Sequence, residues 1–115
     1  MKADLKALWS DNFLLEEYQP LECDNFSLWI ELSIGTRNEE GSDYFRLKVC
    51  TTEWLCKHHW LPELMRHTLL VRKYDFNEIK KTITDCIDQC EGKDWMEIAQ
   101  KLSRVFAWEY EDYQP

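Results

Sequence analysis

The chain has 115 residues, of which 44% are hydrophobic and 31% are charged. This length suits one domain and is too short for two. With only 3 glycines and 3 prolines, the composition excludes collagen-like chains and proline-rich or glycine-rich disordered chains. We therefore expect a single globular domain over residues 1–115.

The sequence shows no segment typical of membrane insertion or export. Its longest apolar run extends only from Val105 to Trp108, whereas a membrane helix needs about 20 apolar residues and a signal peptide about 7 or more. We expect a cytoplasmic protein without membrane contact. The 5 cysteines are odd in number and form no CxxC pair, so we interpret them as reduced thiols that mostly pack in the core.

The charge is strongly negative, at −8. Such a charge opposes a polyphosphate surface, so nucleic-acid binding is not expected. Basic residues outnumber acids between Arg46 and Lys81, and acids dominate from Asp85 onward. An acidic field of this kind attracts a basic partner. The alternative is a solvated surface with no partner.

Three strands are predicted in the first half of the chain. Residues 2–9 alternate between apolar and polar, with Ala3, Leu5, Ala7 and Trp9 forming the predicted inward face. Residues 26–34 show the clearest two-residue period, and a further alternating run begins at Phe45. The polar residues 35–42 between these two strands predict a hairpin with a charged loop.

A short helix and a fourth strand are predicted next. Thr51 is a suitable N-cap, Glu53 lies in the first turn, and Pro62 limits the helix. The β-rich run Thr68–Val71 then predicts a strand.

The last third of the chain predicts two helices and a final strand. Asp75 caps an amphipathic helix that Gly92 closes, and Asp94 caps a third helix whose apolar stripe ends at Val105. Residues 106–110 alternate again and predict a closing strand. The expected order is β-β-β-α-β-α-α-β. This is an α+β fold with a mainly antiparallel sheet of about five strands and three helices packed on one face.

Catalytic and metal-binding motifs are not evident in the sequence. The run Cys56–His59 has zinc-type ligands but lacks a second pair at ligand spacing, so we interpret it as a helix end at the surface. Neighbouring acids on loops are typical of a solvated surface rather than of acid/base catalysis. We expect a protein that is not an enzyme and has no cofactor and no metal. A small enzyme whose site assembles only in space is the remaining alternative.

Acidic residues interleaved with aromatics are the best candidates for a partner-binding surface. Aromatics anchor protein interfaces, and the surrounding acids favour a basic partner. Trp108 and Tyr110 are expected in the core of the last strand, so their neighbours are the better candidates. The predicted partner-binding residues are Glu16, Glu17, Tyr18, Glu39, Glu40, Asp43, Glu109, Glu111, Asp112 and Tyr113.

The order of several short motifs resembles immunity protein family eight of bacterial polymorphic toxin systems. The resemblance covers nearly the whole chain. It is carried by Phe26–Ile30, the Ile34–Gly35 turn, Phe45–Leu55, Leu69–Val71, Tyr74–Asp75 and Trp108–Tyr113.

The resemblance implies a small antidote protein that binds and blocks the C-terminal domain of a cognate bacterial polymorphic or contact-dependent inhibition toxin. It brings no catalytic residues with it. From the charge, we hypothesise that acidic residues occlude a basic active site, such as that of a nuclease. The alternative is a cytoplasmic adaptor or regulatory interaction domain with no toxin partner.

Overall fold

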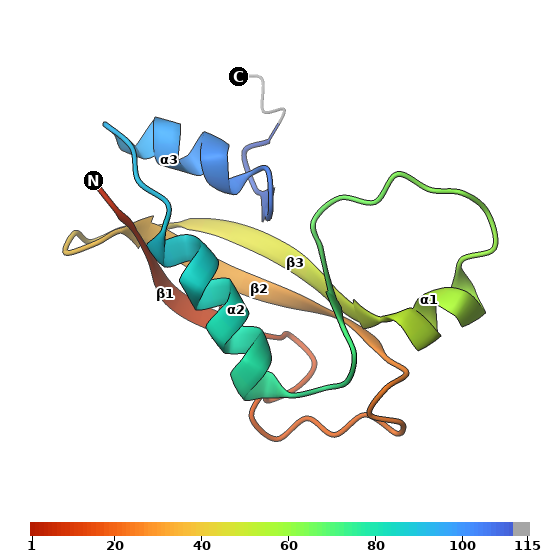
Figure 1. Cartoon of the computed structure of the whole chain (residues 1–115). Coiled ribbons are helices and arrows are strands. Elements are labelled where there is room, and N and C mark those ends of the chain that lie inside the picture. The colour runs from red at the N-terminus through yellow and green to blue at the C-terminus, as the bar shows by residue number, and fades with distance from the viewer. Residues whose placement is uncertain (112–115) are drawn as a thin grey trace.

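A long antiparallel hairpin forms the centre of the sheet (Figure 1). The computed structural model describes residues 1–111. Strands β2 (Ser27–Thr36) and β3 (Asp43–Thr51) pair from Ser27 opposite Cys50 to Ile34 opposite Asp43. Both strands alternate apolar and polar residues, so the hairpin has one apolar face and one mixed face.

The other strands add to both sides of this hairpin. β1 (Ala3–Trp9) pairs antiparallel with β2. On the far side, β4 (Thr68–Val71) runs parallel to β3 and β5 (Ala107–Trp108) runs antiparallel to it. The strand order is β1-β2-β3-β4, with β5 also on β3. The predicted α+β class, mainly antiparallel sheet and element order are confirmed.

One predicted face assignment in β1 is wrong. The register between β1 and β2 shifts between Leu5 and Ala7, which is a β-bulge. A bulge adds one residue to one strand, so the alternation of faces is reset after it. Leu8, rather than Ala7 or Trp9, therefore packs against the core. Trp9 lies on the opposite face of the sheet, where its ring meets Tyr44 edge-on at 6.0 Å.

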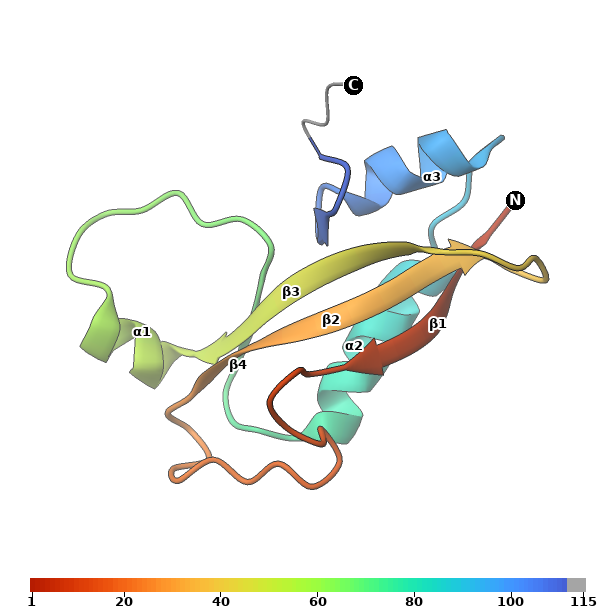
Figure 2. The same ribbon diagram turned by 180° about the vertical axis from the view of Figure 1, so that it is seen from behind.

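Two helices cover the apolar face of the sheet. α2 (Phe76–Asp88) and α3 (Trp95–Leu102) lie on the same side, and the view from behind shows the sheet in front of α2 (Figures 1 and 2). As predicted, Asp75 and Asp94 cap these helices, each accepting a hydrogen bond from a backbone N–H three residues on. The helices bury Ile79, Ile83, Ile87, Ile98, Ala99 and Leu102 against the sheet.

The first helix differs from the other two. α1 (Thr52–His58) follows β3 directly and has no buried residue. Its Trp54 ring lies under the Lys48 ammonium group, 4.4 Å from the ring centroid. Lys48 points to the helix-free face, because its neighbours Leu47 and Val49 are in the core. The expectation that helices pack on one face therefore holds for α2 and α3 and does not extend to α1.

The last two elements are shorter than predicted. α3 ends at Leu102, and Val105, expected in its apolar stripe, is 42% exposed. Ser103 is the C-cap, and Phe106 donates its backbone N–H to the Leu102 carbonyl at 2.9 Å, which turns the chain toward β5. None of the helices in residues 1–111 has the length and apolarity needed to cross a membrane.

Candidate partner-binding surface

The first predicted acidic site lies in the connection between β1 and β2. Glu16 and Glu17 are exposed, and neither forms an ion pair with another described residue. Tyr18 is half-buried and packs edge-on against Tyr74, with ring centroids 4.9 Å apart. Burial raises the pKa of Tyr18. The two carboxylates are therefore available to a partner, whereas Tyr18 is mainly a packing residue.

The second predicted site lies in the β2–β3 hairpin loop. Asn38 and Gly41 have φ angles of 66° and 92°, which place them in the left-handed region. Glu39 and Glu40 lie between them and are exposed. The Lys6 ammonium group donates to the Glu39 backbone carbonyl at 3.0 Å, so the loop is held while both carboxylates face solvent.

Asp43 has a structural role that the sequence did not indicate. Its Oδ2 accepts hydrogen bonds from the indole N–H groups of Trp95 at 2.9 Å and Trp108 at 3.0 Å. Its carboxylate therefore joins β3 to α3 and to β5. Because these contacts occupy the half-buried side chain, Asp43 is a poor candidate for direct partner contact.

The predicted acids at the end of the chain also have partners within the molecule. Glu109 Oε1 accepts from the Tyr44 backbone N–H at 2.9 Å. Glu111 Oε1 accepts from Arg66 Nη2 at 2.7 Å, which ties the end of the chain to the segment before β4. Asp112 and Tyr113 lie outside the described residues.

The predicted acidic residues occupy opposite ends of the sheet. The β2–β3 loop adjoins the start of β1, because Ala3 pairs with Thr36. The connection that carries Glu16 and Glu17 leaves β1 at its other end, after Trp9. The structure therefore gives two separate exposed carboxylate pairs, which we name the loop pair (Glu39, Glu40) and the connection pair (Glu16, Glu17).

The cysteine and histidine run at the end of α1 makes local contacts. His58 stacks on Trp54 with ring centroids 4.6 Å apart, and His59 Nδ1 lies 2.7 Å from Glu63 Oε2. Within residues 1–111, no group of three or more His, Cys, Asp or Glu side chains is placed to hold a metal ion. Burial raises the pKa of the thiols of Cys50, Cys86 and Cys90. At neutral pH these thiols are protonated and therefore poor nucleophiles.

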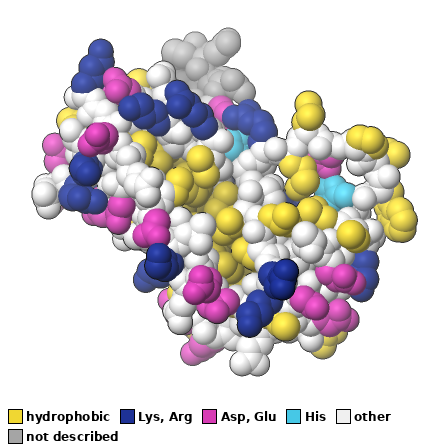
Figure 3. Space-filling view, in the orientation of Figure 1, with side chains coloured by type: hydrophobic (Ala, Val, Ile, Leu, Met, Phe, Trp, Pro, Cys, Tyr) yellow, Lys and Arg dark blue, Asp and Glu magenta, His cyan; other side chains and the backbone are white. Residues whose placement is uncertain are grey.

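The connection between α1 and β4 carries exposed apolar side chains that the sequence analysis did not single out. Figure 3 shows hydrophobic side chains gathered over this connection. Trp60 is 83% exposed and Leu64 is 99% exposed, and Leu61 and Met65 are also exposed. The sequence does contain a signal for this surface: the apolar residues around Pro62 follow neither the helical nor the strand period, so no helix or strand buries them. Exposed apolar patches of this kind mark interaction surfaces.

The helix-free face of the sheet is a second surface that the sequence analysis missed. The Arg46 guanidinium lies 4.6 Å from the centre of the Trp29 ring and forms an ion pair with Glu31 at 2.9 Å. Tyr44 is 55% exposed beside Trp9. Tryptophan, tyrosine and arginine are the residues enriched at protein-binding hot spots. The signal was present in the sequence, since Trp29 occupies the polar position of an alternating strand.

The exposed aromatic, methionine and arginine side chains of these two surfaces are of the types enriched at protein interfaces. A family model described as Immunity protein 8 matches residues 3–113. The chain therefore belongs to the Immunity protein 8 family and is an immunity protein. Comparisons with curated proteins and with solved structures gave no match.

Proposed function

We propose that this immunity protein binds and neutralises the C-terminal toxin domain of a cognate bacterial polymorphic or contact-dependent inhibition toxin. It acts in the cytoplasm as an inhibitor without catalysis of its own. The observation that carries the proposal is the family match over nearly the whole chain.

The proposed mechanism is occlusion of a basic toxin active site by acidic side chains. The loop pair and the connection pair support it, because all four carboxylates are exposed and have no ion-pair partner within residues 1–111. An unpaired exposed carboxylate accelerates encounter with a basic partner. Asp43, Glu109 and Glu111 contribute through the structure instead, since internal hydrogen bonds hold their carboxylates.

Co-expression with the toxin domain encoded immediately upstream tests the function. Cell survival and co-purification of a stable complex are the expected results. Cell death despite soluble expression of the immunity protein would contradict the proposal and favour the adaptor function.

Matched charge reversals test the mechanism. One variant carries Glu39→Lys with Glu40→Lys, and a second carries Glu16→Lys with Glu17→Lys. Both pairs are exposed, so each variant should keep the wild-type stability within about 0.5 kcal/mol. Reversal of the pair that faces the basic site should slow association and abolish survival. Binding of the wild-type chain should weaken as salt increases, and binding of that variant should not. Full neutralisation by both variants would refute acidic occlusion.

A further inference from the structure

The outer edge of β4 is an open sheet edge. β4 pairs with β3 in parallel, and the Lys48 backbone N–H donates to the His67 carbonyl at 3.0 Å. In a parallel ladder, alternate residues direct their backbone groups to the partner strand. The backbone N–H and C=O groups of Thr68 and Leu70 therefore point away from β3. Within residues 1–111 no strand lies on that side.

The outer edge of β4 has little protection against strand addition. Proteins protect open edges with charged side chains, prolines, bulges or very short strands, and of these β4 has only its short length of 4 residues. The sequence of β4 is Thr-Leu-Leu-Val, and Leu70 is 51% exposed. The exposed apolar connection that carries Trp60 and Leu64 leads directly into it. The exposed apolar connection and the strand edge are therefore consecutive in the chain.

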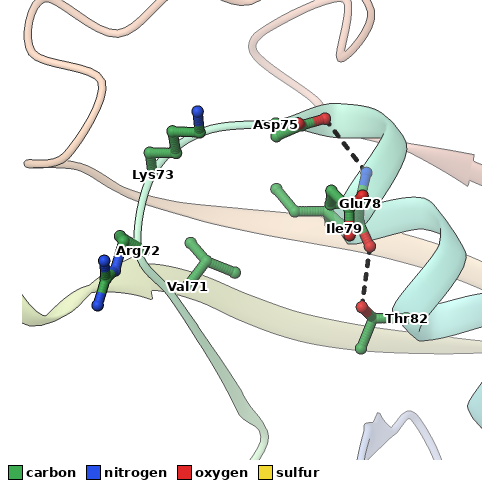
Figure 4. Close-up of a pocket in the computed structure, with 7 residues that line it drawn as sticks. All are labelled: Val71, Arg72, Lys73, Asp75, Glu78, Ile79 and Thr82. Atoms are coloured by element: carbon green, nitrogen blue, oxygen red, sulfur yellow. Dashed lines mark hydrogen bonds between the residues drawn. The ribbon is translucent and has the colours of Figure 1, made fainter.

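An apolar hollow of about 270 Å³ lies beside the end of β4. Figure 4 shows Val71, from the end of β4, and Ile79, from the first turns of α2, directed into the space between the strand and the helix. On the rim, the Asp75 carboxylate already accepts a hydrogen bond from the Glu78 backbone N–H, which caps α2. The hollow can hold an apolar side chain from an added strand.

Two cations without carboxylate partners lie next to this hollow. Arg72 and Lys73 follow β4 directly and are exposed, and within residues 1–111 neither forms an ion pair. By contrast, Arg66, before β4, is paired with Glu111. Glu78 places a carboxylate on the α2 side of the same hollow, so the positive charge is confined to the β4 side. On that side it favours an occupant with carboxylates.

The charge also argues against a second copy of this chain as the occupant. In an antiparallel pairing of two β4 strands, the Arg72 and Lys73 end of one copy would meet the Arg66 and His67 end of the other. At that end the Glu111 carboxylate is already paired with Arg66, so Arg72 and Lys73 would meet no free carboxylate there. An acidic segment of a different protein supplies the carboxylates that a second copy does not.

We propose that the outer edge of β4 receives an extended segment of the toxin domain, which adds a strand to the sheet. The segment places an apolar side chain in the hollow and its carboxylates beside Arg72 and Lys73. Backbone hydrogen bonds to Leu70 supply the register. This inference rests on the proposed function for the identity of the partner.

The test measures binding of the purified toxin domain to the wild-type chain and to three variants by calorimetry. Leu70→Pro removes the outward N–H, which edge strands tolerate, and Leu70→Ala is the matched control that keeps it. Leu70→Pro should weaken binding about tenfold more than Leu70→Ala, which corresponds to about 1.4 kcal/mol. The charge reversal Arg72→Glu with Lys73→Glu should weaken binding at least about tenfold and remove much of its salt dependence.

Hydrogen exchange of individual amides provides a readout specific to strand addition. The Leu70 N–H should exchange rapidly in the free protein and slowly in the complex, whereas the Leu69 N–H, directed to β3, should already exchange more slowly than that of Leu70 in the free protein. Circular dichroism verifies that each variant folds. If Leu70→Pro fails to fold, the charge reversal and the exchange of Leu70 in the wild-type complex decide the question.

The outcomes separate this inference from the proposed function. If the wild-type chain does not bind the toxin domain, the proposed function fails and this inference fails with it. If the wild-type chain binds but Leu70 gains no protection and the charge reversal binds normally, only the β4 edge proposal is overturned. A wild-type dimer that Leu70→Pro dissociates would overturn the assigned occupant in favour of a second copy.

Discussion

Replacement of Asp43 by alanine should destabilise the fold, because one carboxylate oxygen holds two tryptophan side chains. Asp43 Oδ2 accepts from Trp95 at 2.9 Å and from Trp108 at 3.0 Å. A hydrogen bond to a charged group contributes about 1.5–3 kcal/mol. Both indoles are half-buried, so in the variant water can accept part of the hydrogen bonding that the carboxylate provided. We expect Asp43→Ala to lower the free energy of unfolding by about 2–3 kcal/mol.

Urea denaturation followed by far-ultraviolet circular dichroism measures this change. With about 4 °C per kcal/mol for a domain of this size, the melting temperature should fall by about 8–12 °C. Asp43→Asn is the informative comparison. Because both hydrogen bonds end on the same oxygen, an amide oxygen in that position retains them, and the expected loss is about 1 kcal/mol. Glu40→Ala, in the same hairpin, is a control expected to remain within about 0.5 kcal/mol of the wild type.

Two results would contradict this reasoning. If Asp43→Ala were as stable as Glu40→Ala, the carboxylate would not be holding the tryptophans. If Asp43→Asn and Asp43→Ala were equally destabilised, the loss would come from the charge rather than from the hydrogen bonds.

Three further predictions concern other parts of the molecule. Burial raises the pKa of Tyr74 from 10.0 to about 12. Because the folded state favours the neutral phenol, the contribution of Tyr74 to the free energy of unfolding should be fully present below about pH 10 and should be lost as the pH rises to about 12. Ultraviolet titration of the tyrosines, with urea denaturation at each pH, measures this change. Gly35→Ala should lower stability by about 1–3 kcal/mol in the same melts, because a Cβ there would collide with the Gly41 carbonyl oxygen. A thiol reagent should modify the exposed Cys23 and Cys56 quickly and the other three cysteines only slowly or after unfolding, as mass spectrometry over time would show.

The elements predicted correctly are those that depend on local sequence. The caps at Thr51, Asp75 and Asp94 each accept a hydrogen bond from an N–H only three residues away. The alternation in β2 and β3 likewise follows from burial of one face. These signals are complete within a short window of sequence, so the order of elements was predictable.

The features missed depend on contacts between distant residues. The bulge in β1 exists only relative to its pairing with β2. The role of Asp43 requires indoles 52 and 65 residues further along the chain. For the same reason, Glu111 was predicted as a surface acid although it is paired with Arg66, 45 residues away. A local sequence pattern cannot predict contacts between residues that are so far apart along the chain.

The connectivity of the sheet has a kinetic consequence. β2 and β3 are joined by a short loop, so their pairing closes a small loop at low entropic cost. β4 reaches β3 only after the chain has passed through α1 and the long connection that follows it. We therefore expect substitutions in the β2–β3 hairpin to slow folding, and substitutions in β4 mainly to speed unfolding. β4 should also open more readily in the native state than the β2–β3 hairpin does.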